Sequence, residues 1–169
     1  PDSVINLSCL KQGIGLAGED VGKVRIRKNS GIKKILTIEN LTTFFRWQEK
    51  DSLMIYLGGY HNSVRRKLLE LLYQDFPKAE YLHFGDIDVG GFEIYRDLCR
   101  KTGIPFKTYH MGIEELEKYE AYTQELTEND RKRLAALIQK AESEGKDIRV
   151  LLYMKEKGRK LEQEGIRQV

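Results

Sequence analysis

The sequence lacks long hydrophobic runs and has little cysteine, and each shortage excludes a class of protein. No apolar stretch among the 169 residues approaches the roughly 18 residues that a membrane-spanning helix requires. The first residues, Pro1-Asp2-Ser3, do not form the basic and apolar segments of a signal peptide. The two cysteines, Cys9 and Cys99, lie far apart, which argues against a disulfide framework and favours a reducing cytoplasm.

A large excess of charge of one sign is also missing. Lys and Arg number 29 and Asp and Glu 26, so the formal net charge of +3 permits nucleic-acid binding without requiring it. Hydrophobic residues make up 40% and charged residues 33%, the composition of a globular protein large enough for one domain. Because the chain begins abruptly within sequence that has the pattern of folded structure, we expect it to be part of a longer protein.

Short apolar runs alternate with amphipathic stretches from residue 32 to residue 110. The runs predict strands and the stretches between them predict helices, in the order β-α-β-α-β-α-β. Ser63 is the expected N-cap of the second helix, and Gly90-Gly91 is the expected turn into the third. Alternation at this spacing predicts an α/β fold whose four-stranded sheet is mainly parallel and flanked by helices. The predicted strands are 32–38, 52–57, 81–84 and 105–109, and the predicted helices are 41–49, 63–76 and 92–102.

Three regions are expected along the chain. In residues 1–30, the runs Val4-Ile5-Asn6-Leu7 and Val24-Arg25-Ile26-Arg27 predict short strands or a hairpin that leads to an upstream region. Residues 31–112 form the predicted core domain. Residues 113–169 are expected to be a helical extension, since Thr127-Glu128-Asn129-Asp130 is a capping box ahead of an amphipathic stretch that Gly145 ends.

Acidic side chains follow two of the predicted strands. Glu39 comes directly after the first strand, and Asp86 and Asp88 come after the third. Because the carboxyl ends of parallel strands share one edge of a sheet, these acids should lie near one another. Carboxylates at such an edge suit a hard cation such as Mg²⁺. The alternative is a solvated turn that leads into a helix cap for the two aspartates, and an acid at a helix amino terminus for Glu39.

The second strand is followed by residues that could contact a phosphate. Gly58-Gly59 allows a close approach of the backbone, although such a pair most often means a tight turn. His61 is a candidate for phosphate contact or proton transfer, and Arg65 and Arg66 at the start of the next helix are candidates for gripping a DNA backbone. A loop histidine and helix-face arginines without any such role are the alternative.

Three phrases, taken in order, resemble the motifs of the Toprim family. They are Ile35-Leu36-Thr37-Ile38-Glu39-Asn40, Gly58-Gly59-Tyr60 and Phe84-Gly85-Asp86-Ile87-Asp88-Val89-Gly90-Gly91. Toprim domains carry a glutamate after the first strand and an Asp-x-Asp pair after a later one. The chain is similar to the Toprim of the type IIB topoisomerase A subunit, and more closely to the carboxyl-terminal domain of the Wadjet plasmid-defence nuclease subunit. The likeness covers roughly residues 30–112 and the closing phrase Leu161-Glu162-Gln163-Glu164.

The resemblance implies a metal-dependent DNA endonuclease with a Rossmann-like Toprim fold. Glu39, Asp86 and Asp88 would hold one or two Mg²⁺ or Mn²⁺ ions, with Glu164 as a further ligand and Glu39 also as general acid or base. The metal would stabilise charge on the phosphate and activate a water. The resemblance also implies double-stranded DNA as substrate, a homodimer, a condensin-like SMC complex as partner, no membrane, and the bacterial cytoplasm.

Other functions are open to the same residues. A topoisomerase-like domain would cleave a strand with a tyrosine from another domain, but the loop Tyr60-His61-Asn62 lacks the proline expected in that version. A phosphatase of the haloacid dehalogenase type also uses Asp-x-Asp after a strand, yet Gly90 does not fit its motif. The third alternative is a module that binds metal and DNA without cutting.

Overall fold

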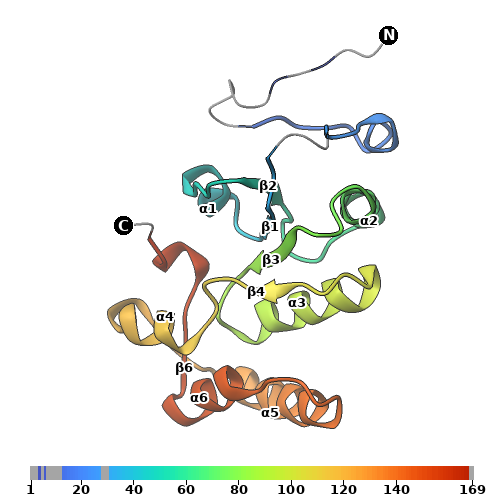
Figure 1. The fold of residues 1–169 in the computed structure, drawn as a ribbon. Coiled ribbons are helices and arrows are strands. Elements are labelled where there is room, and N and C mark those ends of the chain that lie inside the picture. Colours follow the sequence, from blue (N-terminus) through green and yellow to red (C-terminus); the bar gives the residue numbers. More distant parts are fainter. Residues whose placement is uncertain (1–3, 5, 7–12, 28–30, 168–169) are drawn as a thin grey trace.

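A four-stranded parallel sheet lies at the centre of the computed structural model, which describes residues 4, 6, 13–27 and 31–167. The strand order is β2-β1-β3-β4, so each new β-α unit is added beside an existing strand (Figure 1). All four strands run the same way, as the alternating pattern predicts. The strands are β1 Lys34–Ile38, β2 Ser52–Tyr56, β3 Glu80–Phe84 and β4 Lys107–Thr108.

Helices cover both faces of this sheet and continue beyond it. The first three connect the strands, and the later ones form the carboxyl-terminal part, where β5 and β6 pair antiparallel (Figure 1). This arrangement confirms the expected α/β class with a helical carboxyl-terminal part. The elements outside the main sheet are η2 Val21–Lys23, α1 Leu41–Arg46, α2 Ser63–Asp75, α3 Val89–Thr102, α4 Ile113–Lys118, η3 Glu120–Tyr122, β5 Gln124–Glu125, α5 Glu128–Ser143, α6 Arg149–Lys157, β6 Arg159–Lys160 and η4 Gln163–Gly165.

Two apolar clusters pack on the sheet, because successive strand residues point to opposite faces. Ile35 and Tyr81 belong to the cluster shared with α2 and α3. Leu36 and Phe84 belong to the second cluster, which α4, α5 and α6 close. The carboxyl-terminal helices therefore complete the core on one face.

The structure differs from several of the predicted elements in local detail. Residues 24–27 form no strand, and none occurs in the described stretch 13–27, because these residues find no partner strand there. The run 4–7 lies largely outside the described residues. Helix α1 ends at Arg46 because Trp47 takes an extended conformation and turns its ring inward onto Phe84, at 4.9 Å between centroids. Asn62, not Ser63, caps α2 by accepting a hydrogen bond from Arg65 N.

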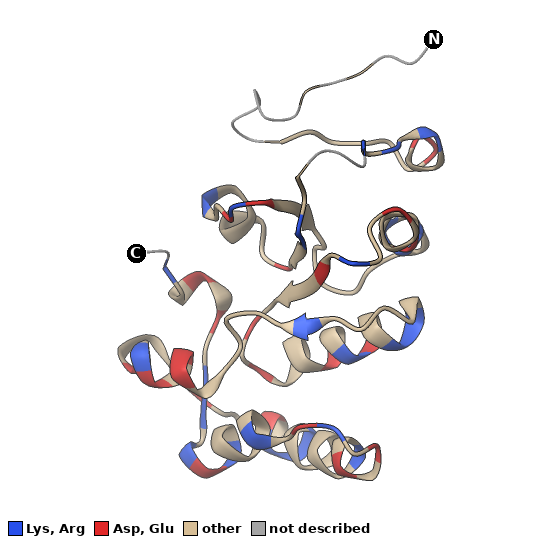
Figure 2. Cartoon of the chain, in the orientation of Figure 1, with Lys and Arg blue, Asp and Glu red and all other residues tan. Residues whose placement is uncertain are grey.

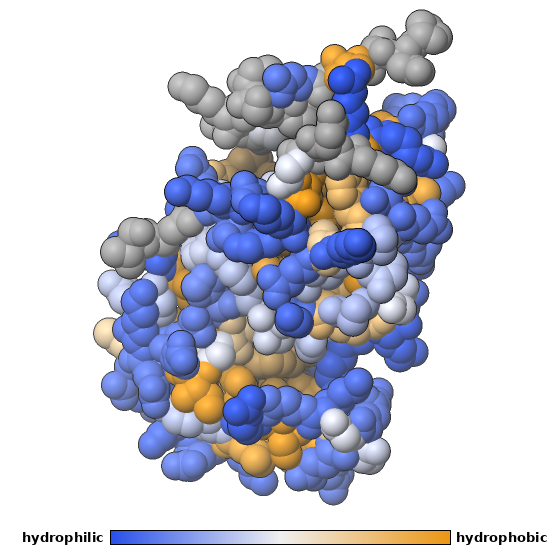
Figure 3. Space-filling view, in the orientation of Figure 1, coloured by the Kyte–Doolittle hydropathy of each residue, from blue (hydrophilic) through white to orange (hydrophobic). Residues whose placement is uncertain are grey.

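The surface view agrees with the charge-rich composition. Its visible face is mainly hydrophilic, with apolar side chains exposed over the carboxyl-terminal helices (Figure 3). One of the exposed apolar residues is Leu152 in α6. No helix in the described part of the chain is long and apolar enough to cross a membrane.

Candidate functional site

The ends of β1 and β3 define the site. These neighbouring parallel strands are aligned with Ile38 opposite Phe84. Glu39 therefore follows β1 at the level at which Gly85 follows β3, and Glu39 N donates to the Phe84 carbonyl at 3.0 Å. The structure thus brings Glu39 and the loop that carries Asp86 to one edge of the sheet, and acidic positions follow both strand ends in Figure 2.

Gly85 makes room for the Glu39 side chain. A Cβ at this position would lie 2.7 Å from Glu39 Oε2 and 2.9 Å from His83 Nε2. Both atoms are buried and have no hydrogen-bond partner among the described residues. The Glu39 carboxylate therefore lies against the bare backbone of Gly85, and a larger residue there would displace it. Burial also lowers the pKa of His83 to about 3, so this neighbour of Glu39 is neutral.

Asp88 caps a helix, which is the role that the alternative interpretation of the two aspartates gives it. It is the N-cap of α3, and its Oδ1 accepts a hydrogen bond from Gly91 N at 2.6 Å. The sequence predicts that Gly90 and Gly91 form a turn before the helix. They instead belong to the first turn of α3. A Cβ at Gly91 would overlap the Asp86 carbonyl oxygen, so this glycine lets the Asp86 backbone pack against α3.

Asp86 is fixed by a segment from the far end of the chain. Its Oδ1 accepts a hydrogen bond from Gln163 N at 2.7 Å. The buried Gln163 amide donates to the Phe84 carbonyl at 3.0 Å and accepts from Asn40 N at 2.8 Å. Next to these contacts, Ile87 and Leu161 exchange backbone hydrogen bonds of 2.8 and 3.0 Å. Residues 161–167, here called the C-terminal segment, therefore join the ends of β1 and β3.

Two further acids of the C-terminal segment lie beside Asp86. Glu164 is exposed, and its Oε1 accepts from Asn40 Nδ2 at 2.8 Å. The negative charges of Glu162 and Glu164 both raise the pKa of Asp86. Glu164 thus lies close to the other acids, while its use as a metal ligand stays a prediction.

Burial and mutual repulsion perturb the acids strongly. Desolvation, followed by the charges of Asp86 and Asp88, raises the pKa of Glu39 to about 7, against a hydrogen bond from the Asp86 backbone. Desolvation likewise raises the pKa of Asp86 to about 6, although the bond from Gln163 N opposes it. Groups with such shifts bind a proton or a cation readily, because either relieves the repulsion.

The donor chemistry fits a hydrated hard cation. Among the described residues, no three His, Cys, Asp or Glu side chains are arranged to hold a metal ion as they stand. Mg²⁺, however, usually keeps several waters and takes only one or two carboxylates from the protein. Glu39 Oε2 is a buried oxygen without a partner in the described part, and it faces the same sheet edge as the aspartates. The all-carboxylate set suits Mg²⁺ or Mn²⁺ rather than a softer metal.

Comparison with known proteins places the chain. Residues 4–169 match the family model described as "Wadjet protein JetD, C-terminal". The chain belongs to the JetD C-terminal family. A curated relative, "Wadjet protein JetD" from Bacillus cereus (strain Q1), is 27% identical over 139 residues, which cover 80% of this chain and 34% of that protein. The chain therefore spans about a third of the length of this relative.

The structure of this JetD C-terminal domain adds two residues that the sequence did not single out. Gln163 touches both strand ends and Asp86, and Glu162 adds charge to the acidic site. Both belong to the phrase Leu161-Glu162-Gln163-Glu164, in which only Glu164 was expected to act. A glutamine between two acids in a charged tail was the only signal in the sequence.

The glycine pair of the JetD C-terminal domain lies at the expected edge, but His61 is not displayed there. Leu57 N donates to the Ile38 carbonyl at 2.7 Å, so Gly58 and Gly59 follow β2 close to Glu39. Both glycines have positive φ, 65° and 76°, which explains their use in this turn. The His61 side chain is buried, with Nε2 3.5 Å from Asp97 Oδ2. Burial lowers its pKa, so the described conformation shows a neutral histidine facing α3.

The two arginines of α2 have partners within the domain. Arg65 lies over the Tyr56 ring, 5.8 Å from its centroid. Arg66 donates to the His61 carbonyl at 3.1 Å. Both are half-buried near the glycine turn, and their contact with DNA stays a prediction.

Proposed function

We propose that this domain hydrolyses phosphodiester bonds of double-stranded DNA with Mg²⁺ or Mn²⁺, as the nuclease part of a bacterial plasmid-defence protein. The observation that carries the proposal is the meeting of Glu39, Asp86 and Asp88 at the carboxyl edge of two adjacent parallel strands. The match to the JetD C-terminal family supports the defence context. The proposal also includes, as the resemblance of the motifs implies, a cytoplasmic homodimer that works with a condensin-like SMC complex.

The surroundings of each acid indicate its role in the proposed reaction. Asp86 and Asp88 each give one oxygen to a backbone N–H, which fixes the direction of the other oxygen. These second oxygens, with Glu39, would hold the cation, which supplies charge stabilisation at the phosphate and activates a water. Glu39, at the same edge of the sheet, would accept a proton from the attacking water. The water oxygen would then bond to phosphorus, the bond to the leaving sugar oxygen would break, and that oxygen would take up a proton from the solvent.

One observation favours a second function, binding without cutting. Asp88 already serves as a helix cap, and the acids do not form a three-ligand cluster as they stand among the described residues. A domain that only binds metal and DNA would need no general base. The two functions differ in whether the products of a DNA incubation are cut.

The test uses the full-length protein with plasmid DNA and Mg²⁺ or Mn²⁺. Glu39→Gln and Asp86→Asn should each lower the cleavage rate by about 10²–10⁴-fold, because each removes a charge or a base from the reacting centre. Glu80→Gln is the matched control. Glu80 begins β3, the strand that Asp86 follows, so it lies at the amino end of the sheet, where it pairs with Lys107 at 3.0 Å. This control should cut at nearly the wild-type rate.

The outcomes separate the two functions. Cleavage that needs the cation and is lost in both site variants supports hydrolysis. If folded Glu39→Gln and Asp86→Asn proteins cut as fast as the wild type, the proposed site is wrong. Wild-type protein that binds DNA in the presence of Mn²⁺ but never cuts it supports the second function.

A further inference from the structure

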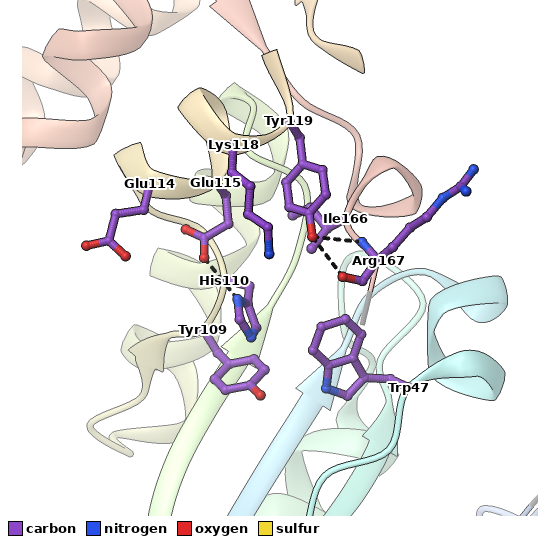
Figure 4. Close-up of a pocket in the computed structure, with 9 residues that line it drawn as sticks. All are labelled: Trp47, Tyr109, His110, Glu114, Glu115, Lys118, Tyr119, Ile166 and Arg167. Carbon is purple, nitrogen blue, oxygen red and sulfur yellow. Dashed lines mark hydrogen bonds and ion pairs between the residues drawn. The ribbon is translucent and has the colours of Figure 1, made fainter. Parts of the chain in front are cut away.

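A cavity of about 340 Å³ opens beside the acidic site. It lies between α4, the residues that follow β4, and the C-terminal segment (Figure 4). Its volume is at the lower end of the range for small-molecule sites, which is enough for a planar group with its substituents. None of the expected site residues lines it.

Aromatic rings form much of the cavity wall. Trp47, Tyr109, His110 and Tyr119 all contribute to it (Figure 4). The first three pack edge to face, with centroids 5.1 Å apart for Trp47 and His110 and 4.3 Å apart for Tyr109 and His110. Such mutual packing fixes the rings in place before any ligand arrives. A rigid aromatic wall suits a flat aromatic ligand.

His110 is held so that one ring nitrogen is committed. Its Nδ1 lies 2.9 Å from Glu115 Oε1, and the other oxygen of Glu115 accepts from Gly112 N at 2.9 Å. Because an ionised carboxylate only accepts hydrogen bonds, Nδ1 carries the proton and Nε2 is left for a ligand. The backbone of His110 is left-handed, with φ 51°, a conformation uncommon for a residue with a side chain.

One cation lies at the rim, where Lys118 Nζ is 5.1 Å from the centroid of the Tyr119 ring. On the other side, Arg167 of the C-terminal segment lines the cavity, but its side chain extends away from it (Figure 4), with the guanidinium carbon 5.9 Å from the centroid of the Tyr122 ring. The Tyr119 hydroxyl holds that segment by donating to the Arg167 carbonyl at 2.7 Å. Aromatic rings next to a basic side chain are the combination with which proteins bind unpaired nucleotides.

The cavity and the acids share a wall. Gln163 contacts Asp86, while Ile166 and Arg167 line the cavity. Four residues span at most about 14 Å, a distance of a few nucleotide steps at roughly 3.4 Å each. The Trp47 ring also packs on Phe84, two residues before Asp86. A DNA strand in the acidic site would pass within reach of this cavity.

We propose that this cavity binds one unstacked nucleotide of the DNA substrate, with the base against His110 and Tyr119 and the phosphate at Lys118. The assignment rests on the proposed function in that it takes DNA as the ligand. It adds that the domain acts on DNA with at least one base out of the stack. Loss of the stacking of one base on aromatic side chains weakens binding by about tenfold.

The test is a double-mutant cycle between protein and DNA. Binding of a gapped duplex to the full-length protein is measured in EDTA, with an abasic site placed at each unpaired position in turn. At one position the abasic site should weaken binding to the wild type about 10-fold, and to His110→Asn less than 2-fold. Asn tolerates the left-handed backbone of residue 110, so this variant removes the ring without straining the chain.

Matched variants and competitors complete the experiment. Lys118→Ala should weaken binding of the gapped duplex several-fold, whereas Lys157→Ala should not, although Lys157 lies over the Tyr153 ring in the same manner, at 5.6 Å. If every abasic position weakens binding equally in wild type and His110→Asn, the cavity does not hold a base. Competition by a free deoxynucleotide that binds tighter than the gapped DNA would also overturn the assignment, since the ligand would then be a free nucleotide.

Failure of this inference is distinguishable from failure of the proposed function. Asp86→Asn should abolish cleavage and leave the cycle unchanged, because the cycle needs no metal. A wild type that never cuts but shows the coupling between His110 and the base refutes hydrolysis and supports the cavity. A wild type that cuts but shows no coupling supports hydrolysis and refutes the binding of a base in the cavity.

Discussion

The Glu39 carboxylate lies in an unfavourable environment, and a bound cation would relieve it. Its Oε2 is buried without a partner among the described residues, and burial together with the charges of Asp86 and Asp88 raises its pKa to about 7. A buried carboxylate with one oxygen left without a partner destabilises the folded protein unless it is protonated or bound to a cation. Functional sites commonly retain this type of unfavourable arrangement, which a purely structural residue would have no reason to keep.

Replacing Glu39 by Gln should therefore stabilise the metal-free protein in a pH-dependent way. The pKa of the group is near 4.5 when unfolded and about 7 when folded, so stability is lost as pH rises between these values. Above pH 7 the variant should be more stable by about 1–2 kcal/mol, allowing for partial exposure, because one pKa unit corresponds to about 1.4 kcal/mol. At pH 4, where the wild-type group is protonated in both states, the gain should vanish. Urea unfolding in EDTA at pH 8 and pH 4 measures this.

Glu80→Gln reports the effect of removing a carboxylate from the amino end of the neighbouring strand β3. A gain for Glu39→Gln that is equal at both pH values, or a loss of stability at pH 8, would contradict the burial of this carboxylate among other acids.

At the scale of elements, the C-terminal segment matters as much as the strands. Gln163 satisfies the Phe84 carbonyl and Asn40 N, and its own N–H holds Asp86. These groups lie more than seventy residues away along the chain. The acidic site is therefore complete only when the segment has folded back onto the sheet.

Gln163→Ala should destabilise the domain by about 1–3 kcal/mol, since Asn40 N loses its hydrogen-bond acceptor and the Phe84 carbonyl keeps only the bond from Glu39 N. The midpoint of urea unfolding should fall with little change in the slope of the transition. Glu164→Gln is the matched control, because Glu164 is exposed and its change leaves the backbone bonds of Gln163 in place. A loss in Gln163→Ala no larger than in this control would refute the anchoring role.

The elements that the sequence predicts well are those with local signals. Apolar runs locate β1, β2 and β3 to within one or two residues, and the capping box locates the start of α5 at Glu128. The two-residue strands β5 and β6 are too short to show any period, and they form only because distant segments meet. Only residues 107–108 of the predicted strand 105–109 pair with β3.

The site residues likewise separate into those with a local signal in the sequence and those that depend on distant contacts. Glu39, Asp86 and Asp88 could be found because position after a strand is a local property that topology turns into proximity. The burial of His61 depends on packing against Asp97 of α3, and the role of Gln163 depends on the return of the C-terminal segment. The cavity at His110 depends on Trp47 and Arg167, which no sequence pattern connects.

At the scale of the whole molecule, an acidic site must be reconciled with a polyanionic substrate. The acids at the strand ends repel phosphates, and the net charge of the chain is only +3. A divalent cation would reverse the local charge, and DNA affinity would come from basic residues elsewhere.

The central claim is that Glu39, Asp86 and Asp88 together hold a divalent cation. Anomalous diffraction from crystals of the full-length protein grown with Mn²⁺ tests it most directly. We expect an anomalous peak at the carboxyl edge of β1 and β3, within about 2.5 Å of at least one carboxylate oxygen of Asp86 or Asp88, and absent in Asp86→Asn crystals. A Mn²⁺ peak bound only elsewhere, or one that persists unchanged in Asp86→Asn, would contradict the account.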